Sequence, residues 1–261
     1  MRKFLLALCL LLPVGLVASQ VISKDTVNTV LAEILQPLQD NNTKVGVQFN
    51  DLVLDAKSVT KLDLKFWLYR QALNNTFDLK IDRLNYDYSN VKNPHLNLLG
   101  SLNLDLVKVI GQEEINEIAS DLELAVKDFS DEMLQEFEGA ATASANVIEK
   151  TLDKSGNFQE LKVAFSVSVD YALLPASKSI AEVEFKALAA TVTFTPKHID
   201  VSLDVMFNPD YMGYGDEVQG LKEHFQMLVD RDSDEMQSVQ SAFYMALDFI
   251  DDVLAQDSSQ P

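Results

Sequence analysis

The alternation of apolar and polar residues constrains the fold most. Residues 62–68 (LDLKFWL) place an apolar side chain at every second position, and residues 45–49 (VGVQF) alternate in the same way. Successive side chains of a β-strand point to opposite faces of its sheet, so this period predicts strands packed on one face and wet on the other. The phase slips at Asp82 and Arg83, which predicts a β-bulge. Further alternating segments are residues 77–81, 84–88, 96–106, 161–171, 181–194 and 199–207.

In other parts of the chain the apolar period is that of an amphipathic helix. Helices are predicted for residues 23–39, 112–154 and 216–254, and the middle one would be long for a globular protein. Together the two patterns predict an α+β fold. We expect a strongly bent antiparallel sheet of about seven strands, packed on one face against long amphipathic helices.

The chain also resembles itself after a shift of 103 residues, which places His95 on His198. The shift indicates an internal duplication, with chance similarity between amphipathic segments as the alternative. A duplication predicts two halves, each made of a helix and three or four strands, followed by a closing helix. The other matched segments are 62–68 with 165–171, and 130–133 with 233–236.

The first residues have the layout of a secretory signal peptide. Arg2 and Lys3 precede an uncharged apolar run at residues 4–18, and small residues follow at the expected cleavage site after Ser19. The run is short for a membrane span, which needs about 20 residues. We therefore predict a signal peptide at residues 1–19 and a protein exported to the periplasm or the extracellular space, with no transmembrane segment after cleavage.

The mature chain, residues 20–261, is predicted to form one compact domain. Its two halves would lie at about residues 22–125 and 126–256, and a short polar tail would follow at residues 257–261. The one cysteine, Cys9, lies within the predicted signal peptide, so the mature chain would have neither disulfides nor thiol chemistry.

Composition excludes several classes of function. The full chain has 40 acidic and 21 basic residues, a net charge of −19, and phosphate would repel so acidic a surface. We therefore expect no nucleic-acid partner. The hydrophobic content of 47% is ample for a packed core and excludes disorder.

No pattern of residues points to catalysis or to a metal. The sequence has no nucleophile elbow, phosphate loop or HExxH helix. Asp230, Asp232 and Asp234 alternate like the first ligands of a calcium loop, but Glu235 stands where the loop needs glycine. Asp232 and Ser233 fit better as a cap where the last helix restarts after a kink. We expect no catalytic residue, no metal and no cofactor, and therefore not an enzyme.

Apolar side chains between the sheet and the helices are the candidate binding residues. Either they fill a core or they line a pocket for an apolar small molecule such as a lipid or fatty acid. Trp67 and Tyr69 alternate out of phase with their neighbours and should lie on the wet face. The predicted lining residues are Phe66, Ile81, Phe129, Met133, Phe165, Phe185 and Phe225.

The sequence thus predicts a secreted or periplasmic, non-catalytic protein that binds an apolar ligand between sheet and helices. The alternative is an envelope or extracellular protein–protein interaction module, inhibitor-like in character, whose acidic surface meets a basic protein partner.

Overall fold

Eight strands form one open antiparallel sheet in the computed structural model, which describes residues 22–54, 59–72, 75–87, 94–211, 214–231 and 233–255. The sheet order is β1-β2-β3-β4-β8-β7-β6-β5. The predicted signal peptide and polar tail lie outside the described residues. The strands are β1 (Thr43–Leu54), β2 (Val59–Ala72), β3 (Asn75–Asp87), β4 (His95–Asn103), β5 (Ala141–Leu152), β6 (Phe158–Val169), β7 (Phe185–Thr195) and β8 (His198–Phe207).

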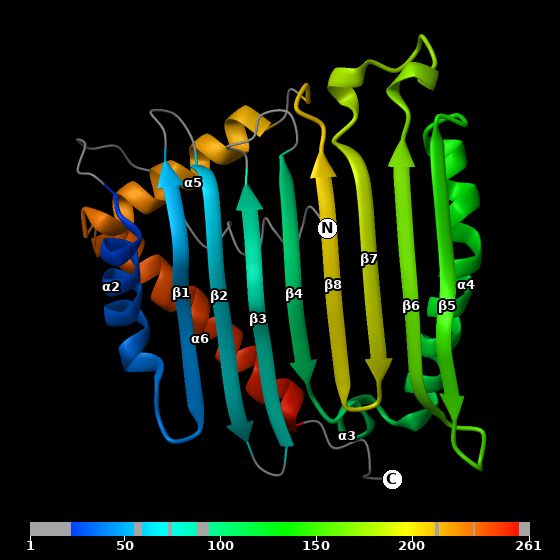
Figure 1. Ribbon diagram of the computed structural model, residues 1–261. Coiled ribbons are helices and arrows are strands. Elements are labelled where there is room, and N and C mark those ends of the chain that lie inside the picture. Colours follow the sequence, from blue (N-terminus) through cyan, green and yellow to red (C-terminus); the bar gives the residue numbers. More distant parts are fainter. Residues whose placement is uncertain are drawn as a thin grey trace.

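The helices pack on one face of this sheet, which confirms the predicted α+β class (Figure 1). Helices α2, α5 and α6 lie over β1–β3, and α4 lies over β5 and β6 at the other end. The short α3 follows β4 at one end of the sheet. The helices are α2 (Lys24–Leu35), α3 (Leu106–Ile110), α4 (Gln112–Glu136), α5 (Tyr214–Val229) and α6 (Ser233–Ala255).

One row of directly paired residues shows that both helix groups share a face. At one end of the row Phe49 contacts Phe225 of α5, with ring centroids 5.4 Å apart. At the other end Phe165 contacts Phe129 of α4, with centroids 5.2 Å apart. Directly paired residues project from the same side of a sheet. The row is Phe49, Leu64, Leu84, Leu98, Leu203, Ala190 and Phe165.

The opposite face is open to solvent and carries the residues predicted to be wet. Trp67 is 37% exposed, and Tyr69 beside it is half-buried. The predicted bulge is also present, because the pairing of β3 with β4 shifts register between Ile81 and Arg83. Within the described ranges, no helix combines the length and the apolar character needed to cross a membrane.

The predicted helix at residues 112–154 is wrong in its second part. Helix α4 ends at Glu136, and β5 follows after a turn in which Glu138 and Gly139 have φ angles of 49° and 85°. These left-handed conformations stop the helix, and the Gly139 N–H donates to the Leu134 carbonyl at 2.8 Å. Alanines alternate with small polar residues in β5, so its apolar pattern fits a helix as well as a strand. The sheet therefore has eight strands rather than about seven.

The two halves of the sheet meet at β4 and β8, which pair over their whole lengths. Leu99 lies opposite Ser202, the residue 103 positions later, and the other pairs are symmetric about this one. A local twofold axis through the pair therefore relates the two strands. Each half is a helix with four consecutive antiparallel strands, and the predicted boundary at residue 125 falls within α4. Duplication as the origin of the halves stays a prediction.

The constant shift of 103 residues is wrong for the other strands. Leu96 pairs through Tyr86 to Leu62, whereas its counterpart Ile199 pairs through Phe194 to Leu161. The equivalent of Leu62 is therefore Leu161 and not Phe165. The connections explain the difference. Fifteen residues separate β6 from β7 and only two separate β2 from β3, which outweighs the shorter connection of β7 to β8, two residues against seven between β3 and β4.

Candidate ligand-binding surface

The helix-side face of the three middle strands has the least helical cover. Leu98 lies in the same paired row as Leu64 and Leu84, which are buried beneath the helices, yet Leu98 is only half-buried. Leu203, opposite Leu98 on β8, is 7% exposed and belongs to the core. The helices pack chiefly on β1–β3 and on β5–β6, which leaves this face of β4, β8 and β7 partly open. We call it the central face. Its half-buried apolar residues include Leu98, Leu102, Leu188, Ala190, Ile199 and Val201.

Helix α6 exposes apolar side chains beside its buried stripe. Phe249 and Met245 are 68% and 66% exposed. Phe249 precedes Asp251 by two residues, so the two project from nearly opposite sides of α6. Asp251 faces β2, and Phe249 therefore points away from that strand. The buried stripe of α6 consists of Val239, Phe243, Leu247, Ile250 and Leu254.

Three of the predicted lining residues lie in the core beneath β1–β3. Phe66, Ile81 and Phe225 are at most 8% exposed and belong to one cluster. Phe66 stacks on Phe243 of α6 with centroids 6.4 Å apart. These three side chains are fully packed by protein.

The other four predicted lining residues gather between α4 and the strands β6 and β7. Phe129 and Met133 on α4, Phe165 on β6 and Phe185 on β7 are all half-buried. Phe185 also contacts Phe137 with ring centroids 5.9 Å apart. The structure thus separates the seven residues into two groups and leaves the second group beside the central face.

Two open depressions are found on the described surface, and neither lies between the sheet and a helix. One, of about 310 Å³, lies on the solvent face of β5–β8 and includes Ser166, Ser168, Ala189 and Asp204. The other, of about 420 Å³, lies between α2 and the end of α5 and includes Thr29 and Arg231.

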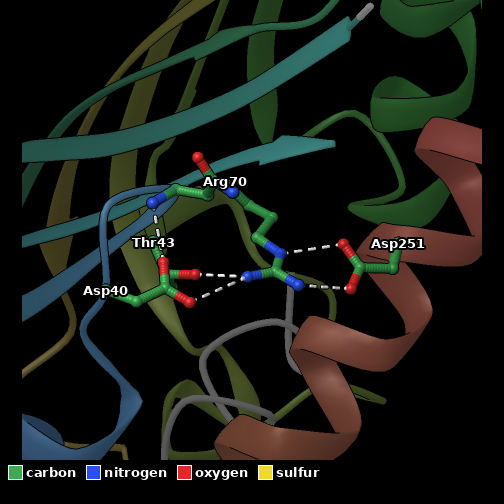
Figure 2. A network of polar contacts seen from close by, with 5 residues as sticks. Asp40, Thr43, Arg70 and Asp251 are labelled. Carbon is green, nitrogen blue, oxygen red and sulfur yellow. Dashed lines mark hydrogen bonds and ion pairs between the residues drawn. The ribbon is translucent and has the colours of Figure 1, made fainter. Parts of the chain in front are cut away.

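The strongest polar cluster joins the first strands to the last helix (Figure 2). Arg70 points to the helix side of β2, and its Nε and Nη2 donate to the two carboxylate oxygens of Asp251 at 2.8 and 2.6 Å. Its Nη1 donates to the hydroxyl of the fully buried Thr43 and lies 3.7 Å from Asp40. The hydrogen bonds from Arg70 lower the pKa of Asp251. Arg70 thereby links β1, β2 and α6.

The histidines do not converge on a metal site. His95 lies opposite Met206, and His198 lies opposite Asn103 at the other end of the same strand pair. The ring of His198 contacts Asn103 Oδ1 and Asp200 Oδ2, each at 2.7 Å. The described part of the chain contains no group of three metal-ligating side chains.

The predicted restart of the last helix is present. Helix α5 ends at Val229 and α6 begins at Ser233, with Arg231 in a left-handed conformation between them. Asp232, the predicted partner of Ser233 in the cap and a member of the rejected calcium pattern, lies outside the described residues.

Sequence reasoning missed the two most exposed apolar residues of α6. A signal existed, because Phe249 lies off the stripe that Phe243, Leu247 and Ile250 define at helical spacing.

Comparison with protein-family models, with curated proteins and with solved structures gave no match to this chain.

Proposed function

We propose that this is a non-catalytic binding protein that holds an elongated apolar ligand, such as a fatty acid or lipid chain, on the central face between α4 and α6. The supporting observation is the half-buried state of the apolar residues there, because Leu64 and Leu84 in the same paired row are buried beneath the helices. Half-exposed leucine, isoleucine and valine side chains in a row gain free energy when an apolar molecule displaces water from them.

The flanks of the central face suit a chain-like ligand. Phe129 and Met133 of α4 lie on one side, and α6 with its exposed Phe249 lies over the first strands on the other. Three strands at a spacing of about 4.8 Å give a width of about 14 Å, which is enough for one acyl chain or a pair of chains. Flexible methionine and aromatic side chains can close over ligands of different shape.

A pair of substitutions on β7 tests this proposal. Ala190 points to the helix side and Ala189 to the solvent face, so Ala190→Phe would fill the central face while Ala189→Phe would not. Affinity for a fluorescent fatty acid should fall at least about tenfold in Ala190→Phe and stay unchanged in Ala189→Phe. Circular dichroism melts of both variants control for folding. A purified protein that carries no lipid in native mass spectrometry and binds no fatty acid would contradict the proposal.

Export is part of the same proposal and has its own test. The N-terminal pattern supports secretion to the periplasm or the extracellular space. The intact mass of the mature protein should correspond to loss of residues 1–19, whose removal takes away Arg2 and Lys3. A mature chain that retains Met1 would argue against export.

An interaction module is the second candidate function, and the surface of α4 supports it. Eight carboxylates on this helix are exposed, and Lys127 is its one basic residue. A basic protein partner would be attracted to such a surface, and salt would weaken the contact. A pull-down at low and high salt tests this candidate, since a partner lost at high salt is expected. The exposed carboxylates are Glu113, Glu114, Glu117, Asp121, Asp128, Asp131, Glu132 and Glu136.

A further inference from the structure

The two edge strands of the sheet differ in the side-chain hydrogen bonds that their backbones receive. At the β1 edge, the side chain of Asn28 on α2 bonds both backbone groups of Phe49. It accepts from the N–H at 2.7 Å and donates to the carbonyl at 2.9 Å. Lys24 donates to the Asn50 carbonyl at 3.1 Å. These contacts occupy the groups that another strand would otherwise pair with.

At the β5 edge α4 packs against the strand and Lys150 pairs with Glu123 of α4 at 2.7 Å, but no such bonds to the strand backbone are found in the described residues. Strand β5 pairs only with β6, and within the described residues no side chain is bonded to the β5 backbone. Its apolar side chains are exposed as well, with Val147 at 40%, Ile148 at 55% and Leu152 at 53%. Backbone groups left unpaired at a strand edge are a template for a further strand.

The regular part of β5 is complementary to itself. Residues 141–147 (ATASANV) carry no charge, and the first register shift against β6 comes after Val147. Alanines and Val147 project to the helix side, while Thr142, Ser144 and Asn146 project to the solvent face. Ser144 already lies 2.8 Å, oxygen to oxygen, from Ser166 on β6. A strand paired about Ser144 would set Ser144 against Ser144 and Thr142 against Asn146, with only small side chains in contact.

We propose that β5 pairs antiparallel with β5 of a second copy of this chain, about a twofold axis at Ser144. In a twofold contact the same surface of each copy meets its counterpart, and residues 141–147 are complementary to themselves in polarity and size. Residues 141–147 are uncharged, but α4 packs against β5 and carries exposed carboxylates. The carboxylates of two copies would repel each other, so the dimer should strengthen as salt screens them. This inference is independent of the proposed function.

Sedimentation equilibrium at low and high salt tests the proposal, with two lysine variants. Ser144→Lys would place two like charges at the axis and should weaken the dimer at least about tenfold. Ser202→Lys makes the same change at an exposed position on β8 in the middle of the sheet and should dimerise like the unchanged protein. A monomer at both salt concentrations, or equal dimerisation of the two variants, overturns the proposal.

A cysteine cross-link checks the register. In a Cys9→Ser background, which removes the chain's one natural cysteine, Ser144→Cys should form a covalent dimer under mild oxidation. Opposed residues of antiparallel strands have Cα separations that a disulfide can span. Ser202→Cys is the matched control and should remain monomeric. Equal cross-linking of the two variants counts against pairing through β5.

Discussion

Arg70 on β2 and Asp251 on α6 form a two-pronged ion pair that fastens the last helix to the first half of the sheet. Both bonds are short, at 2.8 and 2.6 Å, and the guanidinium side chain is 22% exposed. A planar guanidinium matches a carboxylate in this geometry, and lysine could not replace it. The pair therefore fixes where α6 crosses β2.

A double-mutant cycle on Arg70 and Asp251 should give a coupling free energy of about 1–2 kcal/mol, measured by urea unfolding. Removing Asp251 alone leaves a partly buried guanidinium without its carboxylate. The control is the pair Lys61 and Asp51, which is also short at 2.7 Å but more exposed. Its coupling should be smaller than that of Arg70 with Asp251, because water screens an exposed pair. Equal coupling free energies in the two cycles would show that burial of the Arg70 pair does not strengthen it.

Acid should weaken the fold partly through Asp251. The bonds from Arg70 hold the pKa of Asp251 below its ordinary value of 3.8. A carboxyl group with a lowered pKa in the folded state stabilises the fold above its unfolded pKa, and this stabilisation is lost as the pH falls through the folded value. The difference in unfolding free energy between the unchanged protein and Asp251→Asn should therefore be full at pH 6 and shrink below about pH 4. A difference that stays constant from pH 6 to pH 3 would disprove this role.

Trp67 should report any side chain added at Gly46. The indole ring lies over this buried glycine on the solvent face, and a Cβ atom there would be 2.1 Å from the ring atom Cζ2. In Gly46→Ala the ring must turn outward, at a cost of about 1 kcal/mol. Because Trp67 is the chain's one tryptophan, its fluorescence should shift to longer wavelength. Gln48→Ala, two residues along the same face, should leave the emission unchanged.

Tyr171 should resist ionisation. Burial, with a smaller effect from Asp210, raises the pKa of Tyr171 to about 12. Its hydroxyl is buried without a partner in the described structure. The folded state disfavours the phenolate, so stability is full below the ordinary pKa of 10.0 and falls as the pH rises toward 12. Tyr171→Phe should flatten this alkaline loss and, at pH 7, leave stability unchanged or raise it by up to about 1 kcal/mol. Tyr69→Phe, at a hydroxyl bonded to Gln71, is the control.

The sequence predicted those strands whose period excluded a helix. In β2 the alternation of leucines and phenylalanine with charged residues fits a strand alone, and its inner and outer faces are as expected. In β5 the alanines left the period ambiguous, and the decisive feature was a left-handed turn at Glu138 and Gly139. The left-handed conformation of Glu138 could not be predicted from the sequence, because non-glycine residues seldom adopt it.

Contacts between distant residues were beyond a sequence argument. Arg70 follows Leu64, Phe66 and Leu68 at every second position, so the sequence indicates that its charge lies on the helix side of β2 and needs a partner there. That Asp251 supplies the partner depends on how α6 crosses the sheet. The bond of Asn28 to the Phe49 backbone likewise needs the three-dimensional path of α2 along the β1 edge.

The core beneath β1–β3 contains Val27 from the first described helix and Leu254 from the last. This first half of the sheet is therefore completed by the end of the chain as well as by α2, its neighbour in sequence. While the protein is being synthesised, α2 can pack on β1–β4, but part of their apolar face stays uncovered until α5 and α6 have left the ribosome. A chain that lacks residues 233–261 should consequently bind chaperones or aggregate, since these residues include the whole of α6.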